Sequence, residues 1–204
     1  SGGPEGARHA PCLMIGGPRE AVEQVEPMLK DLGIENGYVH AGGSGAGHFV
    51  KLVHNGIEFG MLQAIGEGVA LLESLPDSLD TAGTLECWRH GSVIRSWLVD
   101  LMARAYAEDP AFERPTSYIE DTGEVNWLVG DALTLETPAP VITQSVLELV
   151  KSRDATNTAA KAVTMMRHEF GGHPYDRDEA IAQERKAGRV GPLYRFRGPT
   201  EENG

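Results

Sequence analysis

The chain has 204 residues, of which 41% are hydrophobic and 24% charged, a composition typical of a folded globular protein rather than a disordered or membrane-spanning one. Its 30 acidic and 18 basic residues give a formal charge of −12, which argues against a nucleic-acid or anionic-membrane surface because either would repel the chain. Two cysteines are too few for a disulfide framework and no secretion signal or membrane span is visible, so we expect a cytoplasmic protein.

The first part of the chain predicts a piece of an α/β layer. The apolar run 10–15 predicts a buried strand, the amphipathic stretch 18–33 predicts a helix that Gly33 ends, and residues 38–40 predict a second strand. Two strands alone cannot bury both faces of a sheet or pair both of its edges. We therefore expect the chain, which begins without Met, to start partway through a larger α/β domain.

From Gly45 the sequence is helical in character almost to residue 170. The first predicted helix is about thirty residues long, well above the usual ~11 to 12, because apolar and small residues recur at helical spacing from Phe49 to Leu72. A second long helix is expected at 85–107, with a buried side formed by Trp88, Ile94, Trp97, Leu98 and Leu101. A loop is expected at 109–121, followed by three shorter helices at 125–135, 141–150 and 155–170. A charged, weakly periodic tail is expected beyond Pro174.

These elements predict a mainly α protein that is preceded by a remnant of an α/β sheet. Residues 1–43 would be the remnant, 44–173 an all-helical domain, and 174–204 a polar tail. A thin set of helices buries little apolar surface by itself, and small residues on the first long helix allow close approach of another backbone. We therefore expect a homodimer that shares one core.

Four polar residues on the first long helix form a candidate catalytic constellation. Lys51, His54, Asn55 and Glu58 are spaced i, i+3, i+4 and i+7, which places them within an arc of about 100°, with Lys51 and Glu58 about 10.5 Å apart along the axis. The set supplies a potential base, a potential acid and two hydrogen-bonding groups, which suits proton transfer at two ends of a small polar substrate. The alternative is a solvated polar stripe on an amphipathic helix.

Four strings resemble one enzyme family, the decarboxylating 6-phosphogluconate dehydrogenases in their shorter bacterial form. They are SGGPEGAR at 1–8, AGHFVKLVHNGIEFG at 46–60, WRHGSVIRSWL at 88–98 and RHEFGGH at 167–173. VHNGIE is the specific part, because related β-hydroxyacid dehydrogenases share the Lys and Asn but usually lack the His-Asn pair. The resemblance implies that residues 1–43 are the end of a Rossmann domain whose dinucleotide fingerprint is missing here, and that 44–173 bind substrate and dimerise.

The resemblance also implies an activity and the residues that carry it. The reaction would be the oxidative decarboxylation of 6-phosphogluconate to ribulose 5-phosphate, in the pentose phosphate pathway, with NAD or NADP and without a metal. Lys51 would accept and return the C3 hydroxyl proton, and Glu58 would protonate C1 after carbon dioxide leaves. His54 and Asn55 would hold the substrate, and Asn55 would also contact the cofactor. Ser1, Gly2 and Gly3 would bind the substrate carboxylate.

At the phosphate end of the implied site, several residues differ from the family pattern. Arg167 and His173 correspond to residues that reach the phosphate in the neighbouring subunit, although both could instead interact with the carbonyl end of their own helix. The family has a phosphate-binding Tyr where Phe59 stands, and basic or glycine-loop residues where the chain has Thr122, Val125 and Leu149. Either Lys151, Arg153 or another basic group substitutes, or the ligand is not a sugar phosphate.

Three functions therefore stay open from the sequence. The first is the helical substrate and dimer part of a 6-phosphogluconate dehydrogenase, for which we expect no cofactor reduction by this chain alone. The second is a related β-hydroxyacid dehydrogenase on another hydroxy acid. The third is a non-catalytic dimeric binding module that kept the helical core.

Overall fold

The computed structural model describes residues 2–75 and 78–187. The chain divides into two compact units, Ser1–Arg153 and Asp154–Gly204. The three-part division predicted from the sequence has its boundaries after residues 43 and 173 and stays a prediction. Of the expected tail, residues 188–204 lie outside the described residues.

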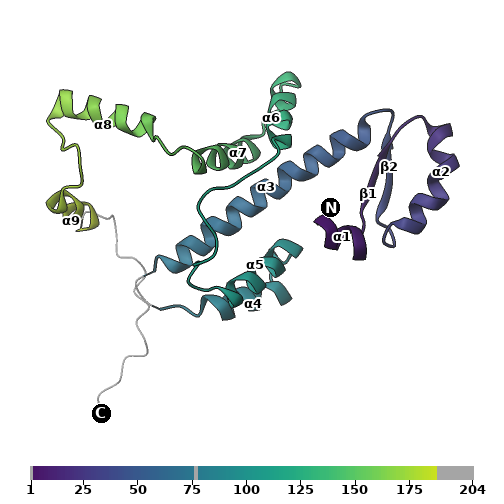
Figure 1. Ribbon diagram of the computed structural model, residues 1–204, viewed down its shortest axis with the longest axis horizontal. Coiled ribbons are helices and arrows are strands. Elements are labelled where there is room, and N and C mark those ends of the chain that lie inside the picture. Colours follow the sequence, from purple (N-terminus) through teal and green to yellow (C-terminus); the bar gives the residue numbers. More distant parts are fainter. Residues whose placement is uncertain (1, 76–77, 188–204) are drawn as a thin grey trace, which may run out of the picture. The chain divides into compact units, whose positions relative to one another are not determined.

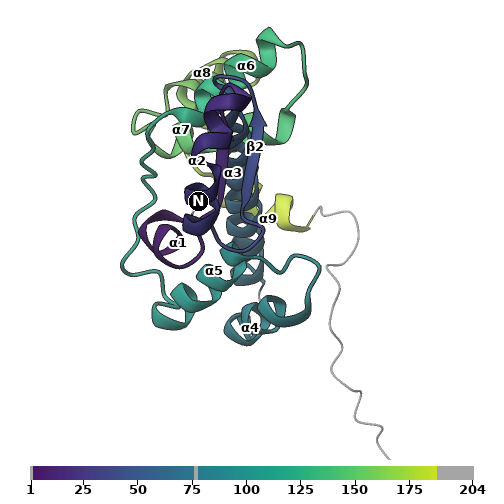
Figure 2. The ribbon, with the colours of Figure 1, turned by 90° about the vertical axis from the view of Figure 1, so that its right-hand side faces the viewer.

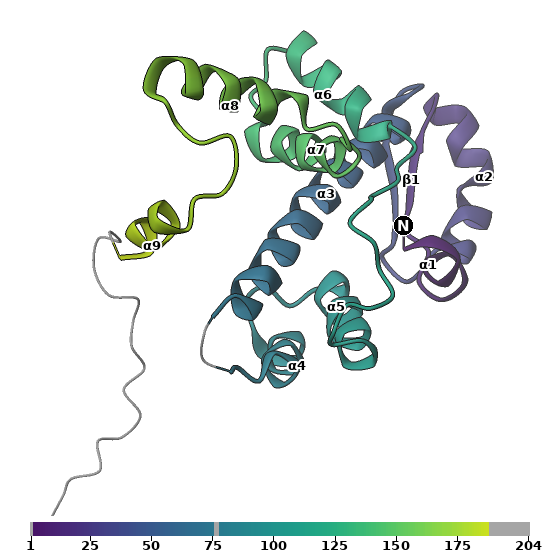
Figure 3. The ribbon, with the colours of Figure 1, turned by 60° about the vertical axis from the view of Figure 1, so that its left-hand side comes forward.

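The first unit begins with the predicted α/β piece (Figure 1). Strands β1 (Leu13–Gly16) and β2 (Tyr38–Gly42) pair in parallel and are joined by α2 (Arg19–Leu32), as expected from the sequence. A short helix that the sequence analysis did not anticipate, α1 (Gly3–His9), precedes them. Figures 1 and 3 show the two strands between α2 and the first turns of α3, so both faces of this small sheet carry a helix.

The predicted long helix is α3 (Ala46–Glu73), with 28 residues. Gly45 caps its N-terminus in a left-handed conformation (φ 87°), which glycine adopts without steric cost. The first turn is pressed against the end of β1, because a Cβ on Gly47 would lie 2.7 Å from the backbone nitrogen of Gly16 and even closer to the Met14 carbonyl oxygen. This close approach fixes where α3 leaves the sheet.

The single helix predicted over 85–107 is wrong. The structure has two helices, α4 (Thr81–Gly91) and α5 (Trp97–Glu108), which pack against each other and against α3. The break is local, because the Ser96 hydroxyl accepts a hydrogen bond from the Val99 amide (3.3 Å) and so caps a new helix. Ile94, Trp97 and Leu101, predicted on the buried side, are exposed. The core is formed instead by Val69, Leu85, Ala103 and Tyr106, with Trp88 and Met102 against it.

Helices α6 (Glu124–Thr134) and α7 (Pro140–Ser152) agree with the predicted segments to within a few residues. Both pack on α3, on the side away from α4 and α5 (Figures 1 and 2). The contact is made possible by Gly56, which is buried in α3 and faces Leu128 of α6 and Ile142 of α7. The segment between α5 and α6 has no helix or strand, as expected for 109–121.

The second unit contains α8 (Thr158–Gly171), which ends at Gly172 in the left-handed conformation, as the Gly-Gly signal predicts. Beyond Pro174, where the sequence predicts a charged and weakly periodic tail, the structure has one more helix, α9 (Glu179–Ala187). The Asp178 carboxylate accepts a hydrogen bond from the Ile181 amide (3.1 Å), so a capping residue starts this helix.

The fold class predicted from the sequence, mainly helical with a remnant of an α/β sheet, is confirmed. In the part of the chain that the structure describes, no helix is both long and apolar enough to cross a bilayer.

Candidate functional site

The structure brings the four polar residues of α3 together on one face of the helix. Lys51 Nζ donates a short hydrogen bond to Asn55 Oδ1 and lies 3.4 Å from His54 Nδ1. His54 Nδ1 in turn lies 4.0 Å from Glu58 Oε2. The amine and the carboxylate are therefore linked through the imidazole, although their Cα atoms are seven residues apart.

Which ring nitrogen of His54 carries the proton decides which hydrogen bonds this cluster can form. Its Nδ1 lies within hydrogen-bond distance both of Lys51 Nζ and of Asn55 Oδ1, at 3.4 and 3.3 Å. A neutral imidazole nitrogen either accepts or donates, so it accepts from Lys51 or donates to Asn55, not both at once. The His54 and Glu58 side chains are 37% and 40% exposed, which leaves room for a ligand beside them.

The other predicted substrate residues near the N-terminus and on α3 are placed as follows. Gly2 and Gly3 both have positive φ (86° and 64°), and Gly2 lies beside Trp97 of α5. Ser1 lies outside the described residues. Phe59 is half-buried on α3 and has no hydroxyl to donate. The roles predicted for these residues at the substrate stay predictions.

The basic groups that could replace the missing phosphate ligands in the first unit are already paired. Lys151 Nζ lies 3.1 Å from Glu148 Oε2. Arg153 lies 2.9 Å from Asp121 Oδ2 and so anchors the segment before α6. Thr122 donates to Glu124, and Leu149 is only 7% exposed in the core. These positions therefore have structural partners that a phosphate would have to displace.

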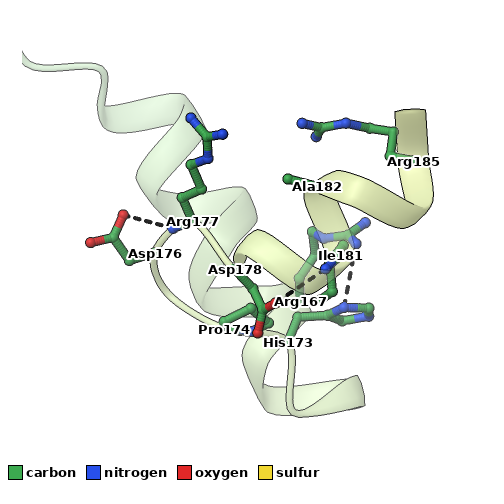
Figure 4. Close-up of a pocket in the computed structure, with 9 residues that line it drawn as sticks. All are labelled: Arg167, His173, Pro174, Asp176, Arg177, Asp178, Ile181, Ala182 and Arg185. Atoms are coloured by element: carbon green, nitrogen blue, oxygen red, sulfur yellow. Dashed lines mark hydrogen bonds between the residues drawn. The ribbon is translucent and has the colours of Figure 1, made fainter. Parts of the chain in front are cut away.

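In the second unit, Arg167 and His173 are brought together at the end of α8 (Figure 4). Arg167 Nη2 lies 3.5 Å from His173 Nδ1. The turn that carries His173 is held by His168, whose Nδ1 donates to the His173 carbonyl oxygen (2.8 Å) and whose ring stacks on Tyr175 at 4.1 Å. The amide of Gly172 donates to the His168 carbonyl oxygen (2.8 Å) at the end of α8. The alternative in which Arg167 and His173 interact with the carbonyl end of their own helix stays a prediction.

Sequence reasoning missed two arginines that lie with this pair. Arg177 and Arg185 line the same cavity as Arg167 and His173, but both fall in the charged, weakly periodic tail, for which the sequence analysis proposes no site. The available signal was Asp178 followed by the helix-forming run EAIAQERKA, a typical helix start.

The carboxyl end of β1, where an open α/β sheet binds a dinucleotide, does not form a cradle here. A Cβ on Gly16 would lie 2.8 Å from the Gly43 carbonyl oxygen and 2.9 Å from the Ala46 amide nitrogen. The start of α3 therefore fills this position, and the described residues do not by themselves fit a nicotinamide dinucleotide. Within the same residues, no three His, Cys, Asp or Glu side chains are placed to hold a metal ion.

Comparisons with known proteins match two separate stretches of the chain. A family model for the C-terminal domain of 6-phosphogluconate dehydrogenase matches residues 47–187, and a model for the NAD binding domain of 6-phosphogluconate dehydrogenase matches residues 1–42. The Bacillus subtilis protein YqeC is 47% identical over 173 residues, which are 85% of this chain and 58% of that protein. The NAD(+)-dependent, decarboxylating 6-phosphogluconate dehydrogenase of Haloferax volcanii is 36% identical over 88% of this chain and 60% of that protein.

This chain therefore spans about three fifths of the length of these curated relatives. Among solved structures, the 6-phosphogluconate dehydrogenase of Plasmodium falciparum superposes with a TM-score of 0.68 at 23% identity, over 87% of this chain and 39% of that one. At this identity the likeness shows a common fold.

Proposed function

Because this chain belongs to the 6-phosphogluconate dehydrogenase family, we propose that its helices supply the substrate-binding and proton-transfer part of the oxidative decarboxylation of 6-phosphogluconate to ribulose 5-phosphate. The observation that carries the proposal is the cluster on α3, in which Lys51, His54 and Asn55 are in mutual contact and Glu58 lies next along the same face. This arrangement holds a base and an acid at the two ends of one short row.

The contacts of Lys51 suit a general base. A neutral amine has two N–H groups and one lone pair, and here Asn55 Oδ1 and His54 Nδ1 can accept the two N–H groups. The lone pair is then used by neither group and can accept the proton of the substrate's C3 hydroxyl. The resulting ammonium can return that proton to the C3 oxygen once carbon dioxide has left.

Glu58 would act at the other end of the row. Loss of carbon dioxide from a β-keto acid leaves an enediol, because the carbonyl accepts the electrons of the breaking C–C bond. A protonated Glu58 carboxyl can deliver the proton that C1 then needs. The hydride acceptor would be NAD or NADP, and since the described residues form no cradle for it, we expect this chain alone not to reduce either cofactor. As part of the proposed function, Asn55 would also contact this cofactor.

The decisive experiment uses the proton-transfer half of the reaction, which needs no redox cofactor. By microscopic reversibility, an acid–base pair that protonates C1 also exchanges the C1 hydrogens of ribulose 5-phosphate with D2O, and proton NMR follows this exchange. We expect exchange by the chain to fall at least about 100-fold in Lys51→Met and in Glu58→Gln.

Glu67→Gln is the matched control, because Glu67 lies on the same helix but is exposed and is paired with Gln63 (2.8 Å). It should leave the exchange unchanged. Equal exchange by Glu58→Gln and the unaltered chain would refute the assigned roles. Unaltered exchange in both active-site variants would favour a non-catalytic binding module.

One observation favours a second candidate, a dehydrogenase of the same superfamily that acts on an unphosphorylated hydroxy acid. Phe59 lacks a hydroxyl, and Leu149 is buried where a basic residue would be needed. Thermal-shift titration separates the two candidates. Stabilisation by 6-phosphogluconate but not by gluconate supports the first, and the reverse supports the second.

We also propose that the protein is a homodimer in which each protomer completes the other's site. Helix α8 has no buried residue among its 14 and exposes Val163, Met165, Met166 and Phe170, which is unusual for a helix in water unless another surface covers it, and we propose that this surface is a second copy of the chain. A partner covering α8 would bring Arg167 and His173 to a neighbouring active site. Light scattering should give twice the monomer mass, and Phe170→Asp should shift it to the monomer.

A further inference from the structure

A cavity of about 260 Å³ lies in the second unit, between the end of α8 and α9. Its charged lining consists of the guanidinium groups of Arg167, Arg177 and Arg185 and the carboxylates of Asp176 and Asp178, with the His173 imidazole beside them. The cavity is smaller than the roughly 300–1,000 Å³ of sites that enclose a whole drug-sized ligand, and it suits a single charged group.

Both carboxylates of the lining are already used by the backbone. Asp176 Oδ1 accepts a hydrogen bond from the Arg177 amide (2.7 Å), and Asp178 Oδ1 accepts one from the Ile181 amide (3.1 Å). They hold the turn and cap α9 but keep their charge, so three guanidinium groups against two carboxylates leave the lining with a net charge of +1. The cavity is therefore a cationic spot in a chain whose formal charge is −12.

Arg177 and Arg185 approach this cavity from opposite walls. Figure 4 shows the Arg177 side chain rising from the turn and the Arg185 side chain reaching back from α9, with both guanidinium groups on the same open side. Arg185 has no ion pair with any described residue, and Arg177 is paired only with Glu179 at 3.0 Å, where both side chains are more than 60% exposed. An ion pair this exposed contributes only about 0–1 kcal/mol.

The remaining groups of the lining also present donors. Arginine has only N–H donors, so in its 3.5 Å contact with Arg167 the His173 Nδ1 must accept, and a neutral His173 then carries its proton on Nε2. Three guanidinium groups and an imidazole N–H around one small cavity match the oxygens of a tetrahedral dianion, which accepts several charge-assisted hydrogen bonds.

We propose that Arg177 and Arg185 bind the phosphate of the substrate, and that they are the residues that select a phosphorylated sugar acid over an unphosphorylated one. The inference rests on the proposed function for the identity of the substrate. The proposal also names a basic group for the phosphate other than Lys151 and Arg153. The Arg153 guanidinium is only 24% exposed and is paired with Asp121, whereas Arg185 has no ion pair with a described residue.

The test is calorimetric titration of the full chain with three probes, namely 6-phosphogluconate, gluconate and inorganic phosphate. Loss of one charge-assisted hydrogen bond should weaken binding of the two phosphate-bearing probes by about ten- to a hundredfold in Arg185→Gln and in Arg177→Gln, with gluconate binding unchanged. Arg185→Lys keeps the charge but loses the planar fork, so its affinity should lie between those of the unaltered chain and Arg185→Gln.

Arg19→Gln is the control for overall charge, because Arg19 lies on α2, is exposed and pairs with Glu23 at 2.8 Å. It should leave all three affinities unchanged. If both Arg177→Gln and Arg185→Gln bind 6-phosphogluconate and inorganic phosphate as the unaltered chain does, the proposal is wrong. If the unaltered chain binds phosphate, loses it on Arg185→Gln, and binds neither sugar acid, the cavity assignment stands and the proposed function fails.

Discussion

Replacing Gly56 by Ala should leave the protein less stable than the same change at Gly66 of the same helix, which should stabilise it. Gly56 is buried in α3, and a Cβ there would overlap Leu128 Cδ2 of α6 and lie 3.2 Å from two side-chain carbons of Ile142 in α7. Leu128 is only 6% exposed, so its side chain is covered by neighbouring residues. Either α6 or α7 must therefore shift away from α3.

The magnitude follows from two opposing terms. Alanine is about 1 kcal/mol more favourable than glycine in a helix interior, whereas forcing a methyl group into a packed contact costs about 1–3 kcal/mol. Gly66 lies on the same helix, and a Cβ built there would have nothing within 4 Å. Gly66→Ala therefore gains the higher helix propensity of alanine without the cost of a packed contact. The difference between the two variants should therefore be about 1–3 kcal/mol.

Urea denaturation followed by circular dichroism measures this difference. The two variants should have the same dependence of unfolding free energy on urea and different midpoints, with Gly66→Ala above the unaltered chain and Gly56→Ala below Gly66→Ala. If the two variants are equally stable, α6 and α7 do not pack on α3 as closely as the structure has them.

Three further outcomes are expected from the structure. Gly47→Ala should lower the unfolding free energy by at least about 1–3 kcal/mol, because the new Cβ meets the backbone carbonyl of Met14, which cannot rotate away; a urea midpoint equal to that of the unaltered chain would contradict this. The hydrogen bonds from Tyr106 and Thr81 hold the pKa of Glu73 in the folded chain below its ordinary value of 4.5. The unfolded chain therefore binds a proton at Glu73 more readily than the folded chain does. The stabilisation that these bonds give above about pH 4.5 is lost as the pH falls through the lower pKa of the folded state. Tyr106→Phe should reduce that acid sensitivity in melting curves recorded across this range, and an unchanged pH dependence would remove the explanation. Asp80→Ala should cost about 1 kcal/mol through loss of the α4 cap, while Asp80→Asn, measured by the same denaturation, should retain most of it.

The local features of this protein could be derived from its sequence. The helix α3 and the polar row from Lys51 to Glu58 follow from a 3.6-residue period, which depends only on positions along one helix. The two strands, α2 and the glycine end of α8 likewise follow from turn and cap signals within a few residues.

The tertiary structure decided which segments of the chain pack against one another. The Ser96 cap separates α4 from α5, but the packing of these two helices against each other around Tyr106 depends on contacts between segments, which periodicity along the chain does not record. Arg177 and Arg185 meet Arg167 only because His168 fixes the turn after α8 and Asp178 starts α9 beyond it. A cavity forms where two elements converge in space, and no repeat along the chain records that convergence.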